Sequence, residues 1–239
     1  MLGKFYGVGI GPGSPDLLTL RAKRVLEAVN VICVPRSATG EHSLARSILE
    51  KALTGAAQYL ELDFPMVRDK ETLHQHWDRA VERIVERLQM GEDVAFATLG
   101  DPLLYSTYNY VLSIMQQRFP QVTVETVPGL SSFSAAASLA NLSLAEGEEA
   151  VAILPVPHDS GHLERVLREF DTVVLMKVAD RLGMVLEVLR RLGLMEKAVL
   201  VSRAGLPGET VVRDLSSITD AKLGYLSVII VATRERKGT

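Results

Sequence analysis

The sequence predicts an α/β protein built from two α/β domains with mixed sheets. Strand-like and helix-like segments alternate along most of the chain, as in folds whose strands are joined by crossover helices. The chain has 239 residues, more than the roughly 100 to 200 residues of one typical domain. Hydrophobic residues make up 47% of it, which is enough for two cores. We expect one domain over residues 1–126 and a second over 127–239.

The first domain begins with a βαβ unit. Residues 5–10 are apolar and β-prone. The loop 11–15 ends this strand, because proline lacks a backbone donor and glycine tolerates positive φ. Asp16 is expected to cap a helix over residues 17–29, where apolar side chains recur at helical spacing. The later elements are predicted as strands at 31–34, 93–99 and 122–127 and helices at 70–90 and 107–118.

The second domain continues the alternation. Its predicted strands lie at 151–154, 172–177 and 198–202, and its predicted helices at 135–140, 163–170 and 182–192. A last apolar stretch at 226–232 is expected to pair as an antiparallel or edge strand, because mixed sheets are common.

Composition excludes several classes of protein. The formal net charge is -3, without the basic excess with which nucleic-acid binders neutralise phosphates, so we expect no nucleic-acid partner. Cys33 is the only cysteine and lies in an apolar run, which predicts a buried strand residue and no disulfide. No apolar run approaches the roughly 18 residues that span a bilayer. We therefore expect a cytoplasmic protein without a membrane segment.

A metal site is not expected either. His74 and His76 are two positions apart on a predicted helix, so their side chains point in different directions. No GxSxG motif marks a nucleophilic serine.

A first glycine-rich loop follows the first strand. Residues 7–13 superficially suggest a dinucleotide fingerprint, in which glycines let the backbone approach a pyrophosphate. That fingerprint also needs an acidic residue after the second strand, where this chain has Pro35 and Arg36. A structural loop that only packs against a neighbour is the alternative.

Two further loops follow predicted strands. Gly100-Asp101-Pro102 comes at the carboxyl end of a buried strand, where open α/β sheets bind ligands, and Asp101 is suited to a cationic ligand. Residues 128–132, Pro-Gly-Leu-Ser-Ser, open a helix of small residues with free amides and hydroxyls. A simple Asp-Pro turn and a simple helix cap are the alternatives.

Together these loops resemble the tetrapyrrole methylase family, in which GxGPG, GDP and PGxSS motifs occur in this order. The resemblance continues through residues 175–177 and 203–209. It implies a class III methyltransferase fold with S-adenosylmethionine bound between the domains, a tetrapyrrole facing the first domain, and a homodimer. S-adenosylhomocysteine would be the product. Several stretches are similar to the C20 methylases of cobalamin synthesis, which act on precorrin-2 or cobalt-factor II: residues 5–9, 31–37, 43–45, 64–66 and 100–108.

The resemblance also implies site residues. Cofactor contacts are expected from Pro12, Leu99, Gly100, Asp101, Leu104, Tyr105, Ser131, Ser132, Met176, Ala204 and Gly205. A proton must leave the methylated ring carbon, and Tyr105, Tyr108 and Asp101 are the candidate acceptors. Arg36, Lys177 and Arg203 stand at strand ends, where they are candidates for binding the substrate's carboxylates. Each is equally suited to a solvated surface position.

Three other functions also fit the sequence. Another corrin-ring methylase would differ only in the ring carbon presented to the cofactor. Related enzymes act on ribosomal RNA or on a modified histidine, although the lack of basic excess disfavours RNA. A nicotinamide-binding sensor that uses the first glycine loop is an alternative outside the enzymes.

Overall fold

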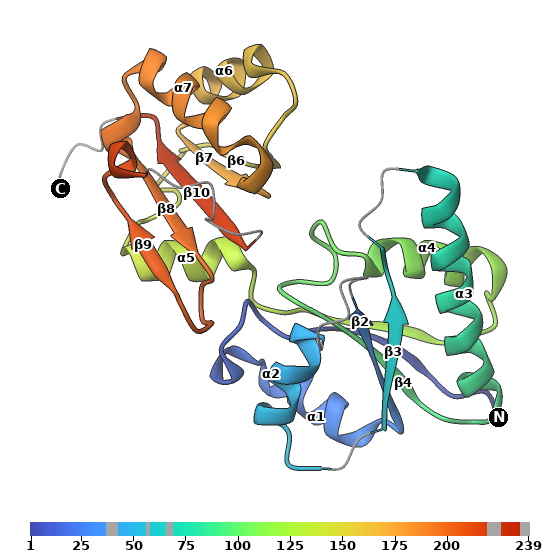
Figure 1. Cartoon of the computed structure of the whole chain (residues 1–239). Coiled ribbons are helices and arrows are strands. Elements are labelled where there is room, and N and C mark those ends of the chain that lie inside the picture. Colours follow the sequence, from blue (N-terminus) through green and yellow to red (C-terminus); the bar gives the residue numbers. More distant parts are fainter. Residues whose placement is uncertain (37–42, 56–57, 66–68, 219–225, 235–239) are drawn as a thin grey trace. The chain divides into compact units, whose positions relative to one another are not determined.

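The chain folds into two compact units, Met1–Ser131 and Ser132–Thr239, in the computed structural model. The structure describes residues 1–36, 43–55, 58–65, 69–218 and 226–234. Each unit has its own sheet with helices on both faces (Figure 1). The boundary expected at 126/127 falls inside a strand of the first unit, β5 (Val124–Val127).

The sheet of the first unit has the strand order β3-β2-β4-β1-β5. Its strands are β1 (Phe5–Gly9), β2 (Val31–Arg36), β3 (Gln58–Asp63), β4 (Val94–Thr98) and β5. Every pairing in it is parallel, because helices carry the chain back between successive strands. The prediction of mixed sheets therefore holds for the second unit alone.

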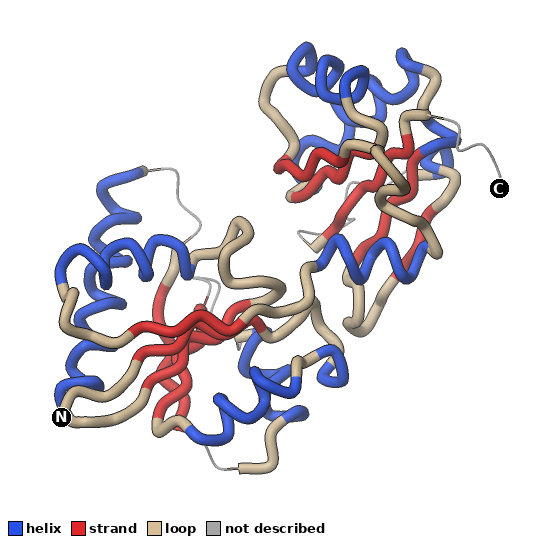
Figure 2. Tube along the Cα trace, turned by 180° about the vertical axis from the view of Figure 1, so that it is seen from behind, coloured by secondary structure: helices blue, strands red, loops and turns tan. Residues whose placement is uncertain are grey.

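Helices cover both faces of this sheet. α1 (Leu20–Ala28) and α2 (Leu44–Ala52) lie on one face, and α3 (Lys70–Gln89) and α4 (Tyr108–Arg118) lie on the other (Figures 1 and 2). The helix predicted at 17–29 is divided into a short 3-10 turn, Pro15–Leu17, followed by α1. Thr19 caps α1, with its hydroxyl accepting from the Ala22 amide at 3.1 Å, so the expected cap at Asp16 was wrong.

The second sheet has the order β6-β7-β10-β8-β9 and is mixed, as predicted. β6 (Val151–Pro155) and β7 (Thr172–Met176) are parallel. β10 (Ser227–Ala232) runs antiparallel to both β7 and β8 (Ala198–Ser202). β9 (Thr210–Val212) pairs antiparallel with β8.

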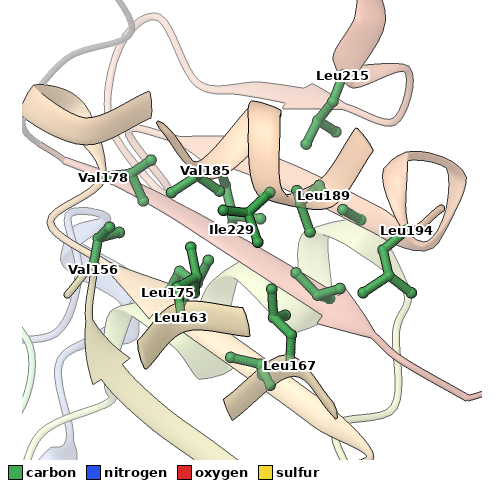
Figure 3. Packing of buried hydrophobic residues seen from close by; sticks show 14 of the residues in the cluster. Val156, Leu163, Leu167, Leu175, Val178, Val185, Leu189, Leu194, Leu215 and Ile229 are labelled. Carbon is green, nitrogen blue, oxygen red and sulfur yellow. The ribbon is translucent and has the colours of Figure 1, made fainter. Parts of the chain in front are cut away.

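One face of the second sheet carries the core of this unit. α6 (Ser160–Glu169) and α7 (Leu182–Leu192) pack there, while α5 (Ser132–Ala140) contacts β8 and β10 on the other face. Figure 3 shows the aliphatic side chains that meet between α6, α7 and the sheet, among them Leu163, Leu175, Val185, Leu189 and Ile229. Each of these is fully buried. No helix in the described part of the chain is long and apolar enough to cross a membrane.

Candidate functional site

The first sheet changes its direction of winding between β1 and β4. These neighbouring strands are followed by helices on opposite faces, because the chain leaves β1 toward α1 and leaves β4 toward α4. A crevice at the carboxyl end of such a pair is the usual ligand site of an open α/β sheet. The loops after β1, β4 and β5 all lie at this edge.

Glycines bring these three loops into backbone contact. Gly100 donates its amide to the carbonyl of Gly11 at 2.8 Å. A Cβ at Gly129 would lie 2.3 Å from the Gly100 oxygen and 2.7 Å from the Gly9 Cα. A Cβ at Gly9 would lie 2.6 Å from the Gly129 nitrogen. Only residues without a side chain allow this approach.

Gly100 differs from Gly9 and Gly129 in the space around it. Its φ of 72° lies in the left-handed region, and a Cβ built there would meet nothing within 4 Å. The glycine therefore keeps open space in front of the loop, as a site needs where backbone approaches a ligand.

Asp101 ties two of the loops together. Its Oδ1 accepts from the Leu103 amide at 2.9 Å and its Oδ2 accepts from the Gly129 amide at 3.1 Å. Both carboxylate oxygens thus hold backbone in place. This placement favours a role for Asp101 in positioning the loops over a role as proton acceptor.

Tyr105 has an unusual backbone conformation in the loop after β4. Its φ is 52°, which is uncommon for a bulky side chain, and it is 41% exposed. Two buried hydroxyls support the loop beneath it: Thr98 Oγ1 and Ser106 Oγ lie 3.0 Å apart, and Ser106 Oγ accepts from the Tyr108 amide at 3.1 Å.

Tyr108 belongs to the core, which makes it a weaker candidate for the proton acceptor than Tyr105. Its side chain is fully buried between Phe5 and Phe96 on the face covered by α3 and α4, and a Cβ at Gly7 would lie 2.0 Å from its ring. Its hydroxyl lies 2.8 Å from Thr126 Oγ1. Burial raises the pKa of the phenol, and the Thr126 hydrogen bond opposes this rise only in part.

Five further candidates lie in these loops or directly after them. Pro12 is buried in the first loop, Leu99 is half-buried directly before Gly100, and Leu104 is half-buried later in the same loop. Ser131 and Ser132 are half-buried where the first unit ends and α5 begins.

Arg36 is neutralised by acidic neighbours. At the end of β2 its guanidinium lies 2.8 Å from Asp63 and 3.8 Å from Glu61, and the hydrogen bond to Asp63 is the largest cause of its raised pKa. Both partners lie on β3, which the sequence did not predict. Arg36 is therefore a weaker candidate for binding carboxylates than the sequence suggested.

The remaining candidates share one edge of the second sheet. β7 and β8 both pair antiparallel with β10, so their carboxyl ends lie on either side of its first residues. Met176 ends β7 and Lys177 follows it, while Arg203, Ala204 and Gly205 follow β8. Lys177 and Arg203 have φ of 55° and 56°, so both strand exits bend sharply in the left-handed region.

Comparison with known proteins decides the family. The sequence pattern of the tetrapyrrole (corrin/porphyrin) methylases matches residues 4–218. This chain belongs to the tetrapyrrole methylase family. A protein of Methanocaldococcus jannaschii named as a probable cobalt-precorrin-2 C(20)-methyltransferase is 37% identical, over 98% of this chain and 97% of its own length. The cobalt-precorrin-2 C(20)-methyltransferase of Salmonella typhimurium is 34% identical, over 97% of each chain.

Solved methylase structures share the fold. The uroporphyrin-III C-methyltransferase of Thermus thermophilus is 25% identical with a TM-score of 0.69, covering 97% of this chain and 94% of its own. A cobalt precorrin-4 methyltransferase superposes with a TM-score of 0.74 at 21% identity, over 97% of this chain and 96% of its own. The predicted fold class, two α/β domains of the class III methyltransferase type, is confirmed.

One segment of this methylase's second sheet edge was missed by sequence reasoning. The residues after β6 lie beside the Met176–Lys177 bend, since the Val156 amide donates to the Met176 carbonyl at 3.0 Å. Arg181 donates to the Val156 carbonyl at 3.0 Å and completes this corner. The only available signal was that β6 and β7 are consecutive parallel strands, whose carboxyl ends share an edge.

Proposed function

We propose that this chain transfers a methyl group from S-adenosylmethionine to C20 of cobalt-precorrin-2 in cobalamin biosynthesis. The observation that carries the proposal is the match to C(20)-methyltransferases over nearly the full length of both chains. Both of these relatives are named for the cobalt-containing substrate. A Sinorhizobium enzyme named for metal-free precorrin-2 is 29% identical over 96% of this chain, and for this reason the cobalt form is our first choice.

The first sheet edge suits the methyl donor. The donor brings a sulfonium-bound methyl group that is already electrophilic, so the protein's task is mainly to bind and orient both reactants. Open space at Gly100, with the backbone of Leu99 and Gly100 beside it, supports binding here. We assign Pro12, Leu104 and Tyr105 to the same group of contacts. Met176, Ala204, Gly205, Ser131 and Ser132 stay predictions of the resemblance.

The accepting carbon needs no covalent help from the protein. A bridging carbon of a reduced tetrapyrrole is electron-rich, like an enamine carbon, so it needs no enzyme nucleophile. The proton that leaves afterwards requires an acceptor within reach, and Tyr105 is our candidate because it is exposed on the loop. Asp101 is a secondary candidate, since its carboxylate already accepts two backbone hydrogen bonds.

Product analysis tests the proposal. The purified chain is incubated with 13C-methyl-labelled S-adenosylmethionine and, in separate reactions, cobalt-precorrin-2 and metal-free precorrin-2. We expect one new labelled methyl group, placed at C20 by NMR, and a higher kcat/KM on the cobalt form. A methyl at another ring carbon would contradict the C20 assignment, and a preference for the metal-free ring would contradict the choice of substrate.

A homodimer remains a prediction of the family resemblance. Light scattering after size-exclusion chromatography would measure it directly, and a monomeric mass would contradict it.

A further inference from the structure

Three consecutive strand exits bring basic side chains to one edge of the second sheet. His158 follows β6, Lys177 and Arg181 follow β7, and Arg203 follows β8. β6, β7 and β8 all point their carboxyl ends to this edge. We call these four residues the basic rim.

Arg181 is held in place by partners other than carboxylates. Its Nη1 donates to the backbone carbonyl of Val156 at 3.0 Å. Its Nη2 lies 3.0 and 2.9 Å from the two ring nitrogens of His158 and can donate to whichever is unprotonated. A carbonyl oxygen and an imidazole ring fix the direction of the guanidinium, and neither partner is a carboxylate. The side chain is half-buried, which limits its freedom further.

Arg203 is held in the same manner. Its Nε donates to the Pro207 carbonyl at 2.7 Å. Within the described ranges, no ion pair joins Arg181 or Arg203 to a carboxylate, whereas Arg36 at the first sheet is paired with Asp63 and Glu61. A guanidinium has more N–H donors than these contacts use, so both arginines keep donors for a ligand.

Three acidic side chains lie close to the rim in the sequence, and two of them accept backbone hydrogen bonds. Asp159 caps α6 by accepting from the Gly161 and His162 amides, and Glu209 accepts from the Gly205 amide at 2.6 Å. Asp180 is exposed on the same short turn as Arg181. Both signs of charge thus meet at this edge, and the case for the rim depends on the contacts of Arg181 and Arg203 rather than on a net charge.

The backbone is also unusual there. Lys177 and Arg203 both have left-handed φ, which L-residues avoid unless the surrounding structure enforces it. Such conformations concentrate at ligand-binding positions.

We propose that the basic rim binds carboxylates of the tetrapyrrole, and that Arg181, oriented by Val156 and His158, determines specificity for rings that carry many carboxylates. The identity of the ligand rests on the proposed function, because the substrate carries acetate and propionate side chains. Preorganised guanidinium groups bind carboxylates through paired, charge-assisted hydrogen bonds, and little ordering cost remains when the side chain is already fixed.

Stable porphyrins of different charge provide the test. Uroporphyrin I carries both acetates and propionates, and coproporphyrin I carries propionates alone. Their affinities for the full chain are measured by absorbance titration, for the wild type and for Arg181→Gln and Arg181→Lys. We expect Arg181→Gln to weaken uroporphyrin binding about tenfold, roughly the effect of one charge-assisted contact, and to weaken coproporphyrin binding less. Arg181→Lys is expected to restore part of the loss.

The matched control is Arg190→Gln. Arg190 is exposed on α7, close to the end of that helix away from the rim. Because both variants replace an arginine by a glutamine, they have the same net charge. Equal porphyrin affinities in the wild type and Arg181→Gln, or an equal loss in Arg190→Gln, would overturn the proposal. Thermal melting shows whether each variant is folded, and Arg181→Lys keeps the test valid if Arg181→Gln is not.

The basic-rim proposal and the proposed function can each be refuted without the other. If the wild type methylates C20 but Arg181→Gln leaves the KM for cobalt-precorrin-2 unchanged, the rim is wrong and the function stands. If C20 is not methylated but porphyrin binding still depends on Arg181, the rim stands as a polycarboxylate site and the function is wrong. Binding of S-adenosylhomocysteine, measured on the same variants, should be unchanged if Arg181 acts on the substrate alone.

Discussion

At the scale of single residues, burial decides which reactive side chains can take part in chemistry. Tyr108 and Cys33 are both fully buried and both carry groups that could otherwise transfer protons or react. Tyr108 follows a loop predicted to be functional, and nothing in the sequence distinguishes it from Tyr105. The structure separates them, because Tyr105 is 41% exposed while the ring of Tyr108 packs over Gly7.

Tyr108→Phe tests this separation. The variant removes the hydroxyl that lies beside Thr126, and we expect it to lower the free energy of unfolding by about 1 kcal/mol, the net value of a typical hydrogen bond. Turnover should stay close to that of the wild type, since the phenol is out of reach of solvent. Urea denaturation and steady-state kinetics measure the two effects. A loss of kcat of tenfold or more with intact folding would return Tyr108 to the catalytic candidates.

Cys33 should be unreactive in the folded protein. Burial raises the pKa of its thiol to about 12, and Arg83 and Arg87 oppose the rise only weakly. We expect no alkylation by iodoacetamide at pH 8 in the native state and complete alkylation in guanidinium chloride, because the thiolate is the nucleophile. Mass spectrometry measures the modification. Rapid native labelling would show that β2 opens.

The raised pKa of the Cys33 thiol also makes the free energy of unfolding depend on pH. Below the thiol's ordinary pKa both states are protonated, and Cys33 makes no difference. Between that value of 9.0 and about 12 the unfolded chain releases the proton and the folded chain keeps it, so this residue lowers the free energy of unfolding as the pH rises through that range.

At the scale of elements, strong periodicity was predictable and short or peripheral elements were not. α3 and α7 are amphipathic and were predicted within a residue of their bounds. β3 lies at the edge of its sheet with one fully buried side chain, and β9 has three residues, so neither has a clear pattern. The missing β3 had a consequence for the site, because it supplies the acids that pair with Arg36.

The three glycine loops pack against one another as a single unit. Alanine substitutions at Gly129 and Gly100 distinguish a glycine needed for loop packing from one needed for cofactor binding. Gly129→Ala places a Cβ 2.3 Å from the Gly100 oxygen, and we expect it to cost about 1–3 kcal/mol of stability, as overpacking does. Gly100→Ala meets no atom but has to adopt a φ of 72°, which costs about 1–2 kcal/mol. We expect Gly100→Ala to fold and to lose affinity for S-adenosylhomocysteine at least tenfold.

Gly55→Ala is the control for these variants, because its added Cβ meets nothing within 4 Å and its φ is not positive. Denaturant unfolding and calorimetric titration measure both quantities. Unchanged affinity in a folded Gly100→Ala variant would show that the open space at this loop is not used by the cofactor.

At the scale of the whole molecule, the sequence predicted an α/β chain with a mixed second sheet, and its ordered loops indicated the methylase family. What it could not predict depends on contacts between distant segments. The approach of Gly129 to Gly9, the burial of Tyr108 under Gly7 and the corner formed by Val156 and Arg181 each join residues far apart in the chain. In both units, most candidate site residues lie directly after the carboxyl ends of strands, as in other open α/β sheets.

The most direct test of this account is a crystal structure of the chain with S-adenosylhomocysteine. We expect the ligand against the open face of Gly100, in contact with the loops that follow β1 and β4. Density for the ligand elsewhere, with that space filled by solvent, would contradict the assignment of the cofactor to this edge.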